Sequence, residues 1–263
     1  MISISDYDSG FQIDKQVVKR LEKMSGILID QLNSVPIYFV KRETIDHHDT
    51  PLCLNRECIM EIIERYKLEH QVEISNFINI ENIRKLMESA RECLGKCDTI
   101  ACYIADDDNI SKGPHILVCH EKIRHSNKKQ FEDLLIEVIL HELAHAYFSS
   151  GTELKDISKH IIEESLCEAY AFSRFENFNN IYDFMTDPKR PPEYTAFKFW
   201  NKIIEGFELV ISMADWRSRK YRLLIIYLQT YRRFYILYND EFYRYFIQIK
   251  DVEGLATLLL LFS

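Results

Sequence analysis

The feature that most constrains the fold is a strongly apolar segment with helical periodicity over residues 130–149. From Val138 to Thr152 its only formally charged side chain is Glu142. A helix that is apolar around most of its circumference is buried in a globular protein, so we expect this helix to lie in the core. Only 7 glycines and 6 prolines occur among 263 residues, which favours long helices over a turn-rich β architecture.

Shorter patterns on both sides of this helix predict an α+β fold, with a small mixed sheet in the first half and an all-helical C-terminal part. Alternating or β-branched runs predict strands over residues 35–40, 71–77, 99–105 and 115–120. Apolar residues at helical spacing predict further helices over residues 13–32, 57–68, 80–94, 156–178, 194–213, 217–237 and 241–263. Gly95 is expected to end the helix over 80–94.

Composition is typical of a soluble globular protein from a reducing compartment. The apolar fraction is 47% and the charged fraction 28%, which excludes wholesale disorder. The first residues lack the basic and apolar regions of a signal peptide, and the apolar run over 255–263 is too short to cross a bilayer. Seven cysteines, an odd number, suggest no disulfide framework, and Cys93, Cys97 and Cys102 are interpreted as packed thiols. We therefore expect a cytoplasmic protein without a membrane partner.

The net charge of −8 argues against nucleic acid as the partner of the whole chain. Residues 217–250 differ from the rest, because they contain eight Lys and Arg against two acidic residues, together with many tyrosines. Two interpretations remain open for this segment. We favour helices with a core face and a solvated basic face, and the alternative is a surface for an acidic partner or nucleic acid.

The motif that carries chemistry is HExxH over residues 141–145, inside the apolar helix. Residues four apart lie on the same helix face, so His141 and His145 can bind one Zn²⁺. Glu142, beside them, can act as general base toward a metal-bound water. The alternative interpretation is a coincidental spacing of two core histidines and a buried glutamate.

A catalytic zinc needs a third protein ligand and an open fourth position. The next predicted helix offers Glu163, Glu164 and Glu168. At 100° per residue, Glu164 and Glu168 fall in the middle of the apolar stripe of that helix, whereas Glu163 points toward its solvated side. Two buried carboxylates one turn apart need a cation or a histidine as partner.

The pattern of His141, Glu142 and His145, followed after eighteen residues by Glu164, resembles the gluzincin group of zinc metallopeptidases, which includes thermolysin and related aminopeptidases. The resemblance covers about residues 99–178, and the compact core is closer to the small minigluzincins. It implies that Glu164 is the third ligand. It also implies that Glu168, where thermolysin-type enzymes have aspartate, orients a ligand histidine.

The resemblance also implies a function, and a zincin-like catalytic core over residues 96–180. We expect the rest of the chain to form an N-terminal α/β region of unknown role over 1–95 and a C-terminal helical region, packed on the core, over 188–263. The strand over 115–120 would either line the cleft and pair with an extended substrate or be an ordinary sheet strand.

The expected activity is zinc-dependent hydrolysis of peptide bonds in a peptide or protein substrate, with Tyr194 as a candidate donor to the oxyanion. The competing hypothesis is a catalytically silent zincin-like binding or regulatory protein, which could use the basic segment over 217–250.

Overall fold

The computed structural model describes most of residues 2–148 and isolated positions beyond them. The described residues are 2–48, 52–55, 57–58, 61–62, 65, 91–96, 98–148, 164, 167–168, 170–172, 174–177, 180–181, 184, 190 and 194. The chain divides into two units. The first comprises Met1–Pro51, Cys97–Thr152 and Tyr170–Met185, and the second comprises Leu52–Lys96, Glu153–Ala169 and Thr186–Ser263.

The first unit contains a four-stranded mixed sheet with the order β1-β2-β6-β5. Its strands are β1 (Ile4–Asp6), β2 (Ile37–Phe39), β5 (Ala101–Ile104) and β6 (His115–Val118). β1, β2 and β6 run parallel, and β5 is antiparallel to β6. All four residues of β6 are buried, as expected for a strand in a parallel sheet that is covered on both faces. A mixed sheet with several helices agrees with the predicted α+β class.

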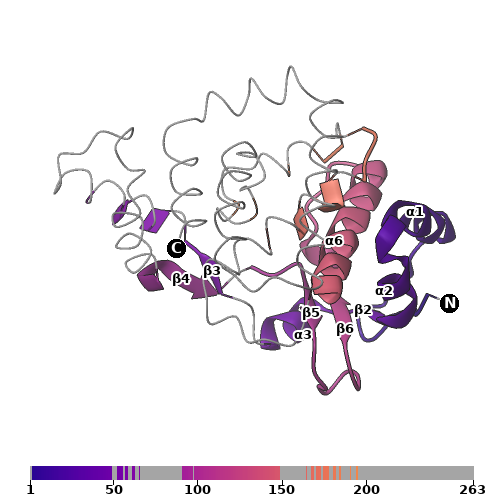
Figure 1. Ribbon diagram of the computed structural model, residues 1–263, viewed down its shortest axis with the longest axis horizontal. Helices are drawn as coiled ribbons and strands as arrows, with labels where there is room; N and C mark the ends of the chain where they lie inside the picture. Colours follow the sequence, from indigo (N-terminus) through magenta and orange to yellow (C-terminus); the bar gives the residue numbers. More distant parts are fainter. Residues whose placement is uncertain are drawn as a thin grey trace, which may run out of the picture. The chain divides into compact units, whose positions relative to one another are not determined.

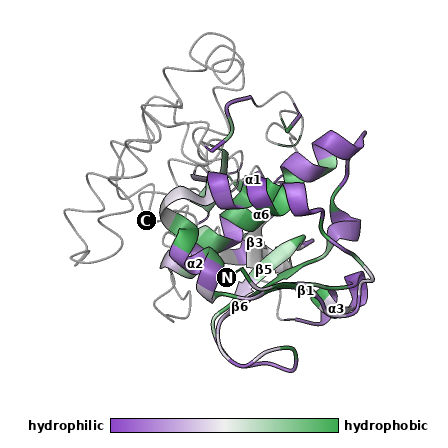
Figure 2. Ribbon diagram, turned by 90° about the vertical axis from the view of Figure 1, so that its right-hand side faces the viewer, coloured by the Kyte–Doolittle hydropathy of each residue, from purple (hydrophilic) through white to green (hydrophobic). Residues whose placement is uncertain are grey.

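The apolar segment forms α6 (Lys128–Phe148), so the prediction of a buried helix over 130–149 is confirmed. Every residue from 133 to 144 is buried. The helix packs against β5 and against two N-terminal helices, α1 (Lys15–Ser25) and α2 (Ile29–Ser34), which lie beside it in Figure 1. Figure 2 shows α1 with hydrophilic as well as hydrophobic residues, as expected for a helix on the surface of this core.

The predicted single helix over 13–32 is wrong in one respect, because it is broken after Ser25. Gly26 follows α1 with a φ of 53° and a ψ of −115°, a backbone conformation with positive φ that glycine adopts readily and other residues rarely do. The chain continues through the 3₁₀ turn η1 (Gly26–Leu28) into α2. The apolar periodicity runs through the break, since Leu21, Leu28 and Leu32 are all fully buried.

The end of α1 is held by residues that come much later in the sequence. The Tyr170 hydroxyl donates to the carbonyl oxygen of Ser25, and Arg174 Nε donates to that of Met24 at 2.7 Å. The last carbonyls of a helix lack partners within the helix, and a cation there also favours the helix dipole. Tyr170 and Arg174 are thus anchored to the same unit as α6.

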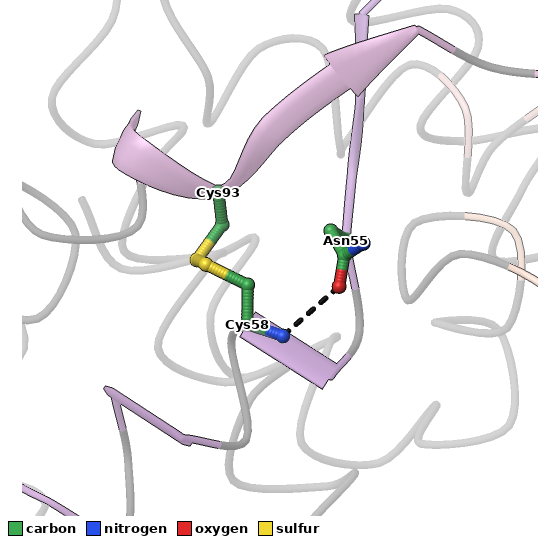
Figure 3. Close-up of a disulfide and its surroundings, with 3 residues drawn as sticks. All are labelled: Asn55, Cys58 and Cys93. Atoms are coloured by element: carbon green, nitrogen blue, oxygen red, sulfur yellow. Dashed lines mark hydrogen bonds between the residues drawn. A yellow bond between two sulfur atoms is a disulfide. The ribbon is translucent and has the colours of Figure 1, made fainter.

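The second unit contains a two-stranded antiparallel sheet, β3 (Leu52–Leu54) with β4 (Leu94–Lys96). A disulfide joins Cys58 to Cys93 beside it, as Figure 3 shows. Asn55 accepts a hydrogen bond from the backbone N–H of Cys58 at 2.9 Å, and its own N–H donates to the carbonyl of Cys93. The interpretation of Cys93 as a packed thiol is therefore wrong, and the number of cysteines no longer supports a reducing compartment.

Several other predictions are corrected in detail. Gly95 lies inside β4 opposite Cys53, not at the end of a helix, because residues 91–93 form the 3₁₀ turn η3 (Arg91–Cys93). Residues 174–177 are not helical, so the helix expected over 156–178 ends earlier. The helix α3 (Arg42–His47) and the 3₁₀ turn η4 (His120–Lys122) were not predicted.

The other sequence predictions lie wholly or largely outside the described residues. They are Cys97, the strand over 71–77 and the helices over 194–213, 217–237 and 241–263. The division into regions 1–95, 96–180 and 188–263 stays a prediction. Among the described residues, no helix combines the length and the apolar character needed to cross a membrane.

Candidate metal centre

Helix α6 brings the two histidines of the HExxH motif together. Nε2 of His141 and Nε2 of His145 lie 3.0 Å apart, and the two rings meet edge to face with centroids 4.8 Å apart. Two imidazole nitrogens on one tetrahedral zinc, each about 2.0–2.1 Å from the metal, would lie about 3.3 Å apart. His141 is buried and His145 half-buried, so the pair has the donors and nearly the spacing that a shared metal ion requires.

Carboxylates accompany the motif. In the first unit, ligand-capable atoms of Glu137 and His141 lie within 4.8 Å of one another. Glu164 and Glu168 are 4% and 1% exposed, which confirms the prediction that both face the core. Glu163 lies outside the described residues.

Glu168 has a cationic partner that the sequence did not reveal. It forms an ion pair with Arg190, whose side chain is only 12% exposed. The Arg190 guanidinium also lies over the ring of Tyr194, 5.4 Å from its centroid, a favourable cation–π arrangement. A buried carboxylate is stable when a cation and hydrogen bonds compensate its charge. Glu168, Arg190 and Tyr194 therefore form one packed group, and a role for Tyr194 toward an oxyanion stays a prediction.

Glu137 is a second residue that sequence reasoning missed. It lies on α6 one turn before His141 and is 1% exposed. The signal was present, because Glu137, His141 and His145 follow one another at intervals of four residues and therefore share a helix face. The apolar stretch considered in the sequence began at Val138, one residue too late to include it.

Glu142, the expected general base, is 8% exposed and lies near β5. Burial, followed by the negative charges of Glu142 and Asp108, raises the pKa of the Cys102 thiol. Cys102 belongs to β5 and is a free thiol, as predicted. Glu142 belongs to α6, which packs against β5.

The sheet order corrects the prediction for the strand over 115–120. β6 is hydrogen-bonded to β2 on one side and to β5 on the other, so its backbone groups are used within the sheet. Of the two alternatives for this strand, the ordinary sheet strand is therefore the one that the structure confirms, and the substrate-pairing strand is excluded. β5 is the outermost strand on this side of the described sheet, and it is the strand next to Glu142.

Two further histidines near α6 have neighbours of a different kind. His120 stacks on Phe11 with centroids 4.4 Å apart, and burial lowers its pKa, partly offset by the charges of Glu121 and Asp6. Nδ1 of His125 lies 2.9 Å from the carbonyl oxygen of Ile123. Among the described residues, neither belongs to a candidate metal group.

Comparison of the chain with protein-family models, with curated proteins and with solved structures gave no match. The likeness to gluzincins therefore depends on the motif and its spacing alone. Zinc binding and peptide hydrolysis enter below as proposals.

Proposed function

We propose that the protein is a zinc-dependent hydrolase of peptide bonds in which His141, His145 and Glu164 hold the metal. The observation that carries the proposal is the 3.0 Å approach of the two Nε2 atoms on α6, and Glu164 is the third ligand that the gluzincin spacing implies. Two histidines and one glutamate are a known ligand set of catalytic zinc sites, which leave the fourth position open.

The donor set also favours zinc over other ions. Imidazole nitrogen suits zinc and later transition metals, whereas calcium and magnesium prefer oxygen ligands alone. Bound zinc would supply Lewis acidity, which polarises a substrate carbonyl and makes a water easier to deprotonate.

Glu142 carries the proton chemistry in this proposal. Its carboxylate accepts a proton from the attacking water while the water oxygen forms a bond to the peptide carbonyl carbon. When the C–N bond breaks, Glu142 donates that proton to the leaving nitrogen, so one residue serves as base and then as acid. A site that only stabilised the fold would need no base at this position, which argues against a catalytically silent protein.

A peptide is the substrate class that the neighbouring sheet favours. An extended peptide can pair with the outer strand of a sheet through its backbone, largely independently of its sequence. In this chain the helix that carries Glu142, α6, packs against β5, the outermost strand on that side of the described sheet. Pairing along β5 would place a scissile carbonyl near Glu142 and the two histidines.

The proposal is tested by metal analysis combined with peptide-library cleavage, on wild type and Glu142→Gln. We expect about one zinc per chain in both proteins and cleavage by the wild type only. Glu132→Gln is a matched control, because Glu132 is a partly exposed carboxylate on the same helix, paired with Arg20 and Lys128, and it should leave both properties unchanged. A wild type without zinc, or full cleavage by Glu142→Gln, would overturn the proposal.

A further inference from the structure

We infer that Glu137 is a positioning residue that holds the imidazole of His141 in its metal-binding orientation. The inference rests on the proposed zinc site and adds to it a residue on α6 that neither the HExxH motif nor the gluzincin resemblance includes. It depends only on α6 itself, on the spacing of Glu137, His141 and His145 along that helix and on the burial of their atoms.

The geometry places the carboxylate next to the His141 ring. Glu137 and His141 are four residues apart on α6, and their ligand-capable atoms lie within 4.8 Å. Nε2 of His141 is directed toward His145, 3.0 Å away. The other ring nitrogen, Nδ1, is fully buried, so a proton on it needs an acceptor within the protein. We infer that the carboxylate one turn earlier on the same face, Glu137, is this acceptor.

The gluzincin resemblance implies this role for Glu168. In the second unit Glu168 is ion-paired with the buried Arg190, and such a pair fixes the position of the carboxylate and compensates its charge. Because Glu137 shares the helix face of His141, we assign the role to Glu137, which differs from what the resemblance implies.

The consequence for the metal follows from imidazole chemistry. When Nδ1 carries the proton and donates it to a carboxylate, Nε2 is left with the lone pair that binds metal, and the ring becomes more basic. Loss of such an acceptor typically weakens metal binding about 10- to 100-fold. Glu137 would in this way determine both the tautomer and the direction of the first ligand of the HExxH motif.

The test measures the zinc dissociation constant of the full chain by competition with a chelator, for wild type, Glu137→Gln and Glu132→Gln. Glutamine keeps the size of Glu137 but removes its charge. We expect binding at least about 10-fold weaker for Glu137→Gln and unchanged for Glu132→Gln. The visible spectrum of the cobalt-substituted protein should change in Glu137→Gln alone, and the Tm of the metal-free protein should be the same for all three.

Each other outcome has a defined meaning. Zinc affinity equal to wild type in Glu137→Gln overturns this inference but leaves the zinc site standing, whereas a wild type that binds no zinc overturns both. If Glu137→Gln does not fold, the tautomer in the zinc-bound wild type decides, measured by long-range ¹H–¹⁵N NMR. A proton on Nδ1 of His141 supports the inference, and metal on Nδ1 with a proton on Nε2 overturns it.

Discussion

The disulfide between Cys58 and Cys93 allows a quantitative prediction. It closes a segment with a sequence separation of 35 residues and fastens η3 and β4 to the residues after β3. In the chain-entropy treatment, a cross-link over a loop of this length reduces the entropy of the unfolded chain by an amount worth about 4 kcal/mol at 25 °C. The double variant Cys58→Ser/Cys93→Ser should lose about that much stability in the second unit.

The loss can be measured locally and globally. Hydrogen exchange followed by mass spectrometry should show faster exchange in peptides covering β3 and β4, while peptides from α6 keep their protection. With a urea m-value of about 2 kcal/mol per M, the unfolding midpoint of the second unit should fall by about 2 M. Cys102→Ser is the control, because Cys102 is a free thiol, and it should leave the exchange of β3 and β4 unchanged.

Two results would refute this reasoning. Peptide mapping of the oxidised protein without reductant should yield a Cys58–Cys93 cross-linked peptide. Free thiols at both positions would show that the cross-link, on which the predicted stability loss depends, is absent. A double variant with wild-type exchange and midpoint would show that the cross-link does not constrain the unfolded chain.

Two further predictions concern the candidate site. Glu164→Ala should abolish tight zinc binding, because it removes a ligand. Glu168→Ala should weaken zinc binding by no more than about 10-fold, but it should lower the unfolding free energy by about 3–5 kcal/mol, since it removes the carboxylate that pairs with the buried Arg190. Metal titration and denaturation of both variants check this, and a larger loss of zinc affinity for Glu168→Ala would reverse the ligand assignment. Since burial and the charge of Glu142 raise the pKa of Cys102, its alkylation by iodoacetamide should be slow at neutral pH, speed up only as the pH rises toward that raised pKa, and become faster in Glu142→Gln. An unchanged rate in Glu142→Gln would show that the two groups are not close.

The parts of the fold that were predicted correctly are those that local sequence determines. α6 is apolar around its circumference, and a helix with this pattern is buried in the core of a globular protein. The strands β2, β5 and β6 are runs of β-branched and aromatic residues between turn formers. Neither β1 nor β3 was predicted, and β1, with the sequence Ile-Ser-Asp, contains no run of β-branched or aromatic residues.

Features that depend on contacts between residues far apart in the sequence could not be predicted. The sheet order places β6 between β2 and β5. This order depends on which strands meet, so no pattern in the sequence indicates that β5 is the outermost strand on its side of the described sheet. The pairing of Cys58 with Cys93 could not be deduced from the number and spacing of cysteines. The break at Gly26 was missed because the apolar periodicity continues on both sides of it.

The candidate site shows the same division. His141, Glu142 and His145 are separated by helical spacing and could be identified from the motif, and Glu137 could have been found by extending the same spacing one turn backward. Arg190 could not, because nothing in the sequence around it indicates an ion pair with Glu168. Local periodicity thus predicts which residues share a helix face. Which charged residues pair with them depends on contacts between segments that are far apart in the sequence.

X-ray absorption at the zinc edge of the metal-loaded full chain is the most direct test of whether two histidines and a glutamate hold zinc. We expect a first shell of nitrogen and oxygen at about 2.0–2.1 Å with the multiple-scattering signature of two imidazoles. The cysteines that form no disulfide, Cys102, Cys119 and Cys167, offer the competing ligand type. A sulfur scatterer at about 2.3 Å, or fewer than two imidazoles, would contradict the assignment of His141, His145 and Glu164.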